Sequence, residues 1–274
     1  MSLRMHDAML RRLGDLRHEP VDTWIRATIG DQVVVDSTRA LLVWEPRRIV
    51  PSYAVPVDDV AADLVPTGTP PATHDGLLYP GIPFAVHSTD GVALDVRVAD
   101  SNRDATAFAP ADPDLHTYVV LDFDAFDAWF EEDERLVAHP RDPYHHVEVR
   151  PSSRHVRIER DGRLLAESVR PTLVLETGLP TRFYLPRDDV RADMRRSDRA
   201  TACAYKGHAI YWAFGDDSDG VDLAWAYPDP LPGVTRLADL VAFFDELVDV
   251  SVDGIARPRP DTLFSRAILD EVGI

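Results

Sequence analysis

The sequence predicts a mainly β protein of the α+β class: two copies of a small domain, each with one late helix, after an N-terminal helix. Three observations lead to this fold class. Short apolar runs with β alternation are separated by turn residues along the chain. The chain also repeats its own residues in a fixed order, and apolar residues recur at helical spacing in only a few segments.

The repeat is visible as matches at a nearly constant offset. Residues 25–45 resemble residues 156–176 at an offset of 131, and residues 56–63 resemble residues 186–193 at an offset of 130. Because the matches keep their order through small insertions and deletions, they indicate two copies of one fold.

Two prolines among polar residues mark the boundary between the copies within residues 139–144. The chain is therefore expected to divide into an N-terminal helix over residues 1–20, a first β repeat with a degenerate motif over residues 21–138, and a second β repeat with the full motif over residues 147–274.

The strands of the second copy follow from its apolar pattern. Residues 156–160 alternate between apolar and polar, Asp161-Gly162 is a hairpin turn signal, and residues 163–167 return as the partner strand. The remaining elements expected before the late helix are a buried strand over 172–175, a short helical start or turn over 187–190, and two strands over 208–214 and 221–227.

Helical spacing identifies the other elements. The late helix of the second copy is predicted by a cap at Thr235 and by apolar residues at Leu237, Leu240, Val241, Phe244 and Leu247. An amphipathic N-terminal helix is predicted from Ser2 to about Leu16, through Met5, Met9 and Leu13.

Charge and cysteine content exclude several classes of function. The formal net charge of −18 over 274 residues repels phosphate backbones and anionic lipid heads, so we expect no nucleic-acid and no membrane partner. A single cysteine cannot form an internal disulfide, and the first residues lack the apolar core of a signal peptide. The composition predicts a cytoplasmic protein without a cofactor, and it leaves the oligomeric state open.

The single lysine and the single cysteine lie three residues apart, in Cys203-Ala204-Tyr205-Lys206-Gly207-His208. Arginine supplies the positive charge elsewhere, so the one lysine indicates a position that arginine could not fill. In an extended strand Cys203 and Lys206 would point to opposite faces, whereas a turn would bring them together. We expect a site here, in the second copy, because the first copy contains neither residue type.

Two stretches of the second copy resemble the bacterial domain of unknown function family 427. They are residues 176–186 and residues 203–207, with Ala204 where members usually carry proline. Residues 43–48 and 51–56 resemble the first half of tandem members. The resemblance implies a compact β fold similar to the tent-like fold of methionine sulfoxide reductase B, and it implies no established activity.

Lys206 and Glu176 are the candidate catalytic residues. An ammonium that is partly removed from water among aromatic residues can lose its proton more readily, so Lys206 could act as a base, a Schiff-base nucleophile or a point charge for an anion. Glu176 ends an apolar strand, where a carboxylate could transfer protons or orient a ligand. The competing interpretation is structural: an ion pair between Lys206 and Glu176, or between Glu176 and Arg182 or Arg170.

Seven further residues are candidates for lining a ligand pocket around this pair: Tyr184, Cys203, Tyr205, Gly207, Trp212, Trp225 and Tyr227. Aromatic residues with polar tips are common in ligand sites, although most aromatic residues of a β protein belong to its core. A thiol close to an ammonium ionises more easily, whereas a buried cysteine commonly serves as a small apolar residue.

One segment around the boundary is rich in groups that bind metals: His139, Asp142, His145, His146 and His155. Their spacing fits no zinc signature, so we expect no metal site. A nucleotidyltransferase label sometimes attaches to the family, and Asp122-Phe123-Asp124 resembles paired acids that share Mg²⁺. The chain lacks the Gly-Ser pair that would hold a triphosphate, and the repeat aligns this segment with the predicted late helix, so this activity is disfavoured.

Two hypotheses for function follow. The first is binding or turnover of a small anionic metabolite in a pocket of the second repeat around Lys206 and Glu176. The second is a non-enzymatic structural or interaction module in which the same residues form a structural staple. They differ in whether internal partners satisfy Lys206 fully and whether a cavity lies beside it.

Overall fold

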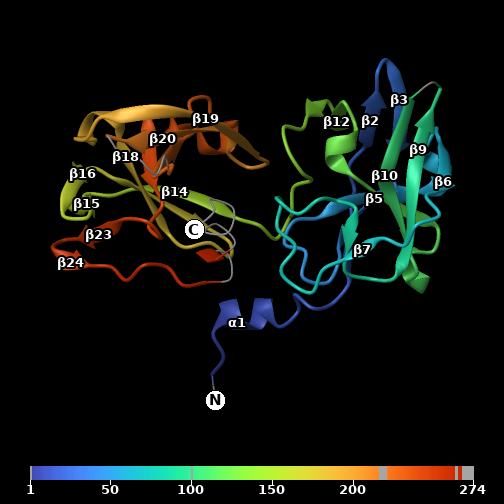
Figure 1. Ribbon diagram of the computed structural model, residues 1–274, viewed down its shortest axis with the longest axis horizontal. Helices are drawn as coiled ribbons and strands as arrows, with labels where there is room; N and C mark the ends of the chain where they lie inside the picture. Colours follow the sequence, from blue (N-terminus) through green and yellow to red (C-terminus); the bar gives the residue numbers. More distant parts are fainter. Residues whose placement is uncertain (1, 100, 216–220, 263–264, 267–274) are drawn as a thin grey trace. The chain divides into compact units, whose positions relative to one another are not determined.

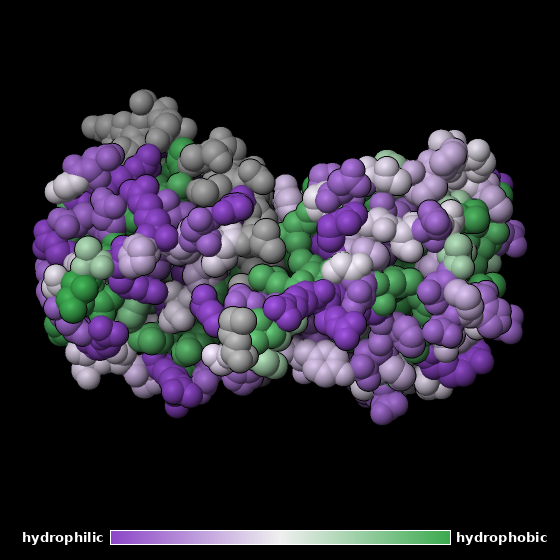
Figure 2. Space-filling view, turned by 90° about the horizontal axis from the view of Figure 1, so that it is seen from below, coloured by the Kyte–Doolittle hydropathy of each residue, from purple (hydrophilic) through white to green (hydrophobic). Residues whose placement is uncertain are grey.

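The computed structural model describes residues 2–99, 101–215, 221–262 and 265–266. The chain divides into two compact units, unit 1 (Met1–Asp142) and unit 2 (Pro143–Ile274), and its described part is mainly β-sheet (Figure 1). This part contains no helix that is long and apolar enough to span a membrane. Hydrophilic residues cover most of the face shown in Figure 2, in keeping with the high net charge.

Unit 1 (blue to green in Figure 1) contains one α-helix, α1 (Met5–Leu10), and three 3-10 helices, η1 (Val57–Asp59), η2 (Pro113–Leu115) and η3 (Phe123–Ala125). Its strands are β1 (Arg17–Pro20), β2 (Ile25–Ile29), β3 (Gln32–Ser37), β4 (Leu41–Trp44), β5 (Ser52–Pro56), β6 (Asp63–Pro66), β7 (Ala72–Thr73), β8 (Val86–His87), β9 (Gly91–Val98), β10 (Ser101–Pro110), β11 (Tyr118–Leu121), β12 (Ala128–Glu131) and β13 (Glu134–Arg135). They form a seven-stranded sheet, β1-β4-β5-β11-β10-β9-β6, a four-stranded sheet, β13-β12-β2-β3, and the parallel pair β7-β8.

Unit 2 (yellow-green to red in Figure 1) contains two 3-10 helices, η4 (Arg187–Asp189) and η5 (Pro232–Leu237). Its strands are β14 (Val147–Pro151), β15 (Val156–Arg160), β16 (Arg163–Ser168), β17 (Thr172–Glu176), β18 (Arg182–Pro186), β19 (Met194–Cys203), β20 (Gly207–Phe214), β21 (Ala224–Ala226), β22 (Leu240–Phe243), β23 (Asp249–Val252) and β24 (Ile255–Ala256). They form a seven-stranded sheet, β14-β17-β18-β22-β21-β20-β19, and a four-stranded sheet, β16-β15-β23-β24.

The strand orders of the two units correspond. Read side by side, the seven-stranded sheets align β4 with β17, β5 with β18, β9 with β20 and β11 with β22. The register agrees as well. Val119 lies opposite Val55 in unit 1, and Val241 lies opposite Leu185 at the corresponding point of unit 2. The edge strands differ most, since β6 has four residues and β19 has ten.

Apolar side chains pack on both faces of the seven-stranded sheet of unit 2. On β18, Phe183 and Leu185 join the core shared with the four-stranded sheet, whereas Tyr184 between them points to the opposite face, as strand alternation requires. We call this opposite face the outer face of unit 2. Val234 and Leu237 of η5 pack on it, and the candidate site lies on this face.

The predicted strands of the second copy are confirmed, with a shorter last member. Residues 156–160 and 163–167 form β15 and most of β16, and the turn residues Asp161 and Gly162 both have positive φ. The strand expected over 172–175 is β17, and the helical turn expected over 187–190 is η4, which ends at Asp189. The last two predicted strands are β20 and the three-residue β21.

The predicted late helix of the second copy is wrong. A 3-10 helix, η5, ends at Leu237, and the next apolar run forms strand β22. This strand lies inside the sheet between β18 and β21, so both of its faces are buried and nearly every position is apolar. A continuous apolar run fits helical spacing by coincidence. At the corresponding point unit 1 has β11 followed by the three-residue η3, not a late helix.

The N-terminal helix is shorter than predicted. It ends at Leu10, turns follow, and Arg17–Pro20 form β1, which pairs with β4. No side chain caps its first residue, and Met5 and Met9 remain 76% and 48% exposed. A helix of six residues that buries little apolar surface has too little stabilisation to extend further.

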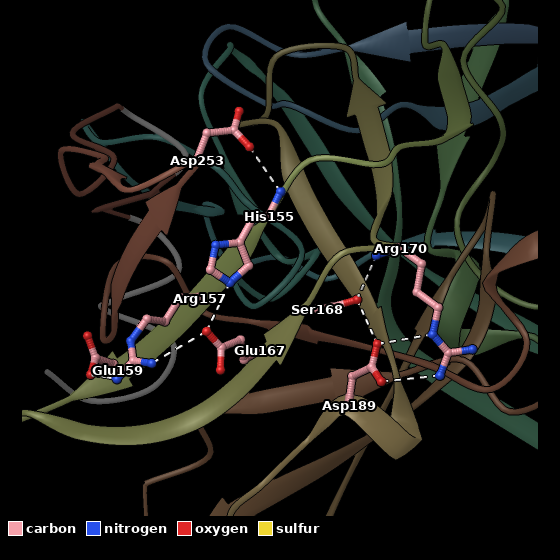
Figure 3. A network of polar contacts seen from close by, with 8 residues as sticks. All are labelled: His155, Arg157, Glu159, Glu167, Ser168, Arg170, Asp189 and Asp253. Carbon is pink, nitrogen blue, oxygen red and sulfur yellow. Dashed lines mark hydrogen bonds and ion pairs between the residues drawn. The ribbon is translucent and has the colours of Figure 1, made fainter.

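A serine–arginine–aspartate clamp occurs at the same place in both units. In unit 2 the Ser168 hydroxyl donates to Asp189 Oδ2 over 2.7 Å, and the backbone N–H of Arg170 donates to Ser168 Oγ over 3.1 Å (Figure 3). The guanidinium of Arg170 then pairs with Asp189 at 3.1 Å. The corresponding contacts in unit 1 join Ser37, Arg39 and Asp59. The clamp ties an edge strand of the four-stranded sheet to a 3-10 turn of the seven-stranded sheet.

Replacing Ser168 with alanine is expected to lower the free energy of unfolding of unit 2 by about 1–2 kcal/mol, because Asp189 loses a hydrogen bond in a partly buried position. Ser37→Ala is the matched variant in unit 1 and should have a similar effect there. Equilibrium urea unfolding measures both. If neither variant differs from the wild type by more than about 0.3 kcal/mol, the clamp does not join the sheets as described.

Candidate functional site

Glu176 and Lys206 form a buried ion pair on the outer face of unit 2. Glu176 is the last residue of β17, and Lys206 ends the turn that joins β19 to β20. The backbone N–H of Lys206 donates to the carbonyl of Cys203 over 3.3 Å, which closes the turn. Lys206 Nζ donates to Glu176 Oε2, and the two side chains are 7% and 10% exposed. The ion pair named by the structural interpretation is therefore present.

Each member of the pair fixes the charge of the other. Burial alone would raise the pKa of Glu176, but the charge of Lys206 and the contacts from His145 and Lys206 outweigh burial and lower it to about 2. Burial alone would lower the pKa of Lys206, but the charge of Glu176 outweighs this and raises it. This shift of the Lys206 pKa is opposite in direction to the one that the sequence predicts. Lys206 keeps its proton at neutral pH, so it is not a base or a Schiff-base nucleophile in this state.

His145 is the second partner of Glu176. Its Nε2 lies 3.1 Å from Glu176 Oε1, and its ring stacks on that of Tyr205 with 4.3 Å between the centroids. The His145 side chain is 19% exposed, so this imidazole lies between a buried carboxylate and the surface. Sequence reasoning missed this role. The register of β14 is the signal that would have found it, because Val147 lies opposite Glu176.

Tyr184, Trp225 and Tyr227 lie with the pair on the outer face. The Tyr184 hydroxyl accepts a hydrogen bond from Trp225 Nε1 over 3.1 Å, and the Tyr227 ring centroid lies 5.9 Å from Lys206 Nζ. Burial raises the pKa of both tyrosines, so both hydroxyls stay neutral and able to donate. Among the residues that the structure describes, the Tyr227 hydroxyl has no hydrogen-bond partner.

Cys203 and Gly207 shape the turn that presents Lys206. They lie opposite each other in the β19–β20 ladder. Gly207 has φ of +97°, and a Cβ there would lie 3.2 Å from the carbonyl oxygen of Asp229, so both the turn and the loop above it require glycine. The N–H of Leu231 donates to the Lys206 carbonyl over 3.2 Å and fixes this loop. Cys203 is a free, partly buried thiol that packs against the outer-face cluster.

Trp212 does not belong to this group. Its neighbour Tyr211 points to the outer face, so Trp212 points to the core between the two sheets, with Phe214. The guanidinium carbon of Arg187 lies 5.2 Å from the Trp212 ring centroid. The structure therefore brings together the other predicted site residues and leaves Trp212 on the opposite side of the sheet.

A second group of buried charges lies beside the outer face. Arg182 Nη2 donates to Glu246 Oε1 over 2.6 Å, and its Nη1 lies 3.7 Å from Asp245. Arg257 Nη1 lies 3.6 Å from the other oxygen of Asp245. The Arg182 guanidinium carbon also lies 5.7 Å from the ring centroid of Trp225. The predicted pairing of Glu176 with Arg182 or Arg170 is wrong, since these arginines pair with Glu246 and Asp189.

Unit 1 carries a buried carboxylate at the corresponding strand end. Glu45 follows β4 directly and is 1% exposed. His87 Nδ1 and Arg48 Nε lie 3.0 and 3.3 Å from its Oε1, and the N–H of Ser88 donates to its Oε2 over 2.8 Å. His87 precedes β9 as Lys206 precedes β20, but the His87 side chain is fully buried. In unit 1 the partners come from β8 and from the residues after β4, whereas in unit 2 they come from the β19–β20 turn and from the residues before β14.

The paired acids at 122–124 and the histidines near the boundary between the units form other contacts. Asp122 Oδ1 accepts the backbone N–H of Asp124 over 3.1 Å, which caps η3. Of the histidines near the boundary, His145 pairs with Glu176 and His155 with Glu167. Across the described residues, no group of three or more His, Cys, Asp or Glu side chains could hold a metal ion.

Comparison with known proteins identifies one family. Residues 148–254 match the family described as Domain of unknown function (DUF427). The match supports DUF427 membership of unit 2. The matched DUF427 residues include Glu176, Lys206 and most of the outer face, whereas His145 lies just before them. Comparison with the curated proteins gave no match.

The ion pair of unit 2 is expected to stabilise the fold down to strongly acidic pH. Because the pKa of Glu176 is lowered in the folded state, its contribution is fully present above the ordinary glutamate value of about 4.3. The contribution is lost as the pH falls toward the folded value of about 2. Urea midpoints of the wild type should therefore fall more steeply in this range than those of the double variant Lys206→Met/Glu176→Leu. Parallel curves would contradict the assignment.

Proposed function

We propose that unit 2 binds a small molecule with an oxygen acceptor, in a site formed by Lys206, Glu176, Tyr184 and Tyr227. The observation that carries the proposal is that N–H and O–H donors of this site have no acceptor among the described residues. An ammonium has three N–H donors, and Glu176 is the one hydrogen-bond partner of Lys206 Nζ among the described residues. The Tyr227 hydroxyl has none, and both side chains are almost fully buried. The Tyr227 hydroxyl is not fully enclosed, so an oxygen of a ligand could reach it and accept its hydrogen bond.

Charge balance narrows the class of ligand. Three cations of this region, the buried Lys206 and Arg182 and the partly exposed Arg257, face three carboxylates, Glu176, Asp245 and Glu246. This leaves no excess of positive charge for a phosphate or another polyanion. The expected ligand is therefore a small molecule with a single carboxylate. A neutral carbonyl compound whose oxygen accepts the same hydrogen bonds would also fit.

In this proposal the ion pair is the fixed part of the site and not its reacting group. Lys206 retains its proton because Glu176 raises its pKa, so it contributes a directed positive charge. Tyr184 and Tyr227 add neutral hydroxyls on the same face. These properties favour binding over turnover through a lysine nucleophile.

We also propose that the two units are tandem copies of one DUF427-like fold from the bacterial cytoplasm. Three features support duplication: the corresponding strand orders, the serine–arginine–aspartate clamp in each unit, and the buried carboxylates Glu45 and Glu176 at matching strand ends. In unit 1, His87 and Arg48 occupy the surroundings of the carboxylate, so that unit serves as a scaffold. The free cysteine is consistent with a reducing compartment.

A second candidate rests on a separate observation. Glu45 is neutralised at the corresponding place of unit 1 without a lysine, which is the arrangement that a purely structural staple requires. In that case the protein is a non-enzymatic interaction module, and no ligand accepts from Lys206 or Tyr227.

A thermal-shift screen separates the two candidates. The panel contains small carboxylic acids and 2-oxo acids, each with its amide as a neutral counterpart. A ligand at 100 times its Kd stabilises the fold by about 2.7 kcal/mol, so we expect a rise of several degrees in Tm. Tyr227→Phe removes one hydroxyl and should weaken binding about tenfold, as the loss of one hydrogen bond implies.

Tyr211→Phe is the matched control for this screen. The Tyr211 hydroxyl lies 2.7 Å from Thr201 Oγ1 in the same outer-face cluster, so its loss should leave ligand binding unchanged. If no compound shifts the Tm, or if both tyrosine variants weaken binding equally, the ligand site is excluded and the structural staple remains.

A further inference from the structure

The two oxygens of the Glu176 carboxylate contact different partners. Its Oε2 accepts from Lys206 Nζ, and its Oε1 lies 3.1 Å from His145 Nε2. With a pKa of about 2 the carboxylate is ionised at neutral pH and can only accept. The proton between Glu176 and His145 therefore belongs to Nε2. In a neutral imidazole with Nε2–H, the free lone pair is on Nδ1.

The surroundings of His145 differ from those of the other carboxylate–histidine pairs that the structure describes. His87 is fully buried and contacts Glu45 through Nδ1. His155 contacts Glu167 through Nε2 at 2.9 Å (Figure 3). Both of these side chains are partly exposed, so this carboxylate is not buried as Glu176 is. His146 lies 3.9 Å from Glu148, and both of these side chains are exposed. Among these four pairs of the described residues, His145 alone joins a buried carboxylate to a partly exposed ring.

We propose that His145 is a proton-transfer residue of unit 2, oriented by Glu176 and Lys206, and that its Nδ1 accepts a proton from a hydroxyl or ammonium group of a ligand. The identity of the ligand rests on the proposed function, whereas the orientation of the imidazole does not. A carboxylate that holds one ring nitrogen and leaves the other free is the usual way to orient a histidine base.

The transfer balances in charge. The O–H or N–H bond of the ligand breaks and leaves its electron pair on the ligand, the Nδ1–H bond forms, and Nε2–H stays in place. The group of Lys206, Glu176 and His145 gains one positive charge, and the ligand becomes one unit more negative. The ammonium of Lys206 stays on the other oxygen of Glu176 throughout the transfer.

This arrangement also accounts for the single lysine in a chain otherwise rich in arginine. An ammonium is a compact point charge that can engage one carboxylate oxygen, whereas a guanidinium fork favours both oxygens at once. An arginine at position 206 would compete with His145 for Oε1 of Glu176. Lysine contacts Oε2, so Oε1 remains available to the imidazole of His145.

Nuclear magnetic resonance of the full chain with ¹⁵N-labelled histidine tests the orientation. We expect the neutral form of wild-type His145 to carry its proton on Nε2, and Lys206→Arg to convert it to a mixture or to Nδ1–H. His155 is the internal control, because its carboxylate has no lysine partner, and its signals should not change. An Nδ1–H or doubly protonated His145 in the wild type would overturn the proposal without any variant.

Diethyl pyrocarbonate tests whether the Nδ1 lone pair can react. The lone pair attacks a carbonyl carbon, an N–C bond forms, and the C–O bond to the ethyl carbonate leaving group breaks. The acylated imidazole then loses its Nε2 proton, and ethyl carbonate takes up a proton as it decomposes to ethanol and carbon dioxide. Peptide mapping should find His145 acylated in the folded wild type, several-fold more slowly in Lys206→Arg, and His87 unmodified in both. Equal rates at His145 in the two proteins, or no acylation there, would overturn the proposal.

The outcomes separate this inference from the ligand site. If the Nε2–H tautomer and the acylation are observed but no compound in the thermal-shift panel binds, the proposed ligand fails and the His145 assignment stands. If a compound binds but His145 carries its proton on Nδ1, the His145 assignment fails and the ligand site stands.

Discussion

A buried carboxylate at the end of β17 is the constraint that organises the outer face of unit 2. An unpaired buried charge costs several kcal/mol, so the chain must bring a cation to Glu176. The β19–β20 turn does this with Lys206, and the turn closes because Gly207 adopts a positive φ that other residues avoid. The loop at Leu231 then packs over the turn through a backbone hydrogen bond. Without the Glu176 carboxylate there would be no buried negative charge, and the fold would not need a cation in the β19–β20 turn.

The same constraint recurs in unit 1 with different chemistry. Glu45 is surrounded by His87, Arg48 and the N–H of Ser88, and all of its neighbours are buried or partly buried. Glu176 instead has one buried cation and one partly exposed imidazole. Both units place a buried carboxylate at the end of a strand, and they differ in the side chains that neutralise it.

Much of the fold could be predicted from the sequence because short-range rules decide it. The β15–β16 hairpin follows from alternation around Asp161-Gly162. The late helix could not be excluded in this way, because β22 is buried on both faces and its apolar run fits either period. The pairing of Lys206 with Glu176 was one of the alternatives that the residues allowed. The direction of the Lys206 pKa shift depends on distance, and the place of His145 depends on strand register, so neither could be derived from composition or spacing.

The central claim is that Glu176 and Lys206 stabilise the fold as a coupled pair. A double-mutant cycle with Lys206→Met, Glu176→Leu and the combined variant, measured by urea unfolding, tests it most directly. Each single change leaves a buried charge without its partner and should cost about 3–5 kcal/mol, whereas the combined change should cost far less than the sum. A coupling energy of several kcal/mol is therefore expected. Additive costs, with a coupling energy near zero, would contradict the account.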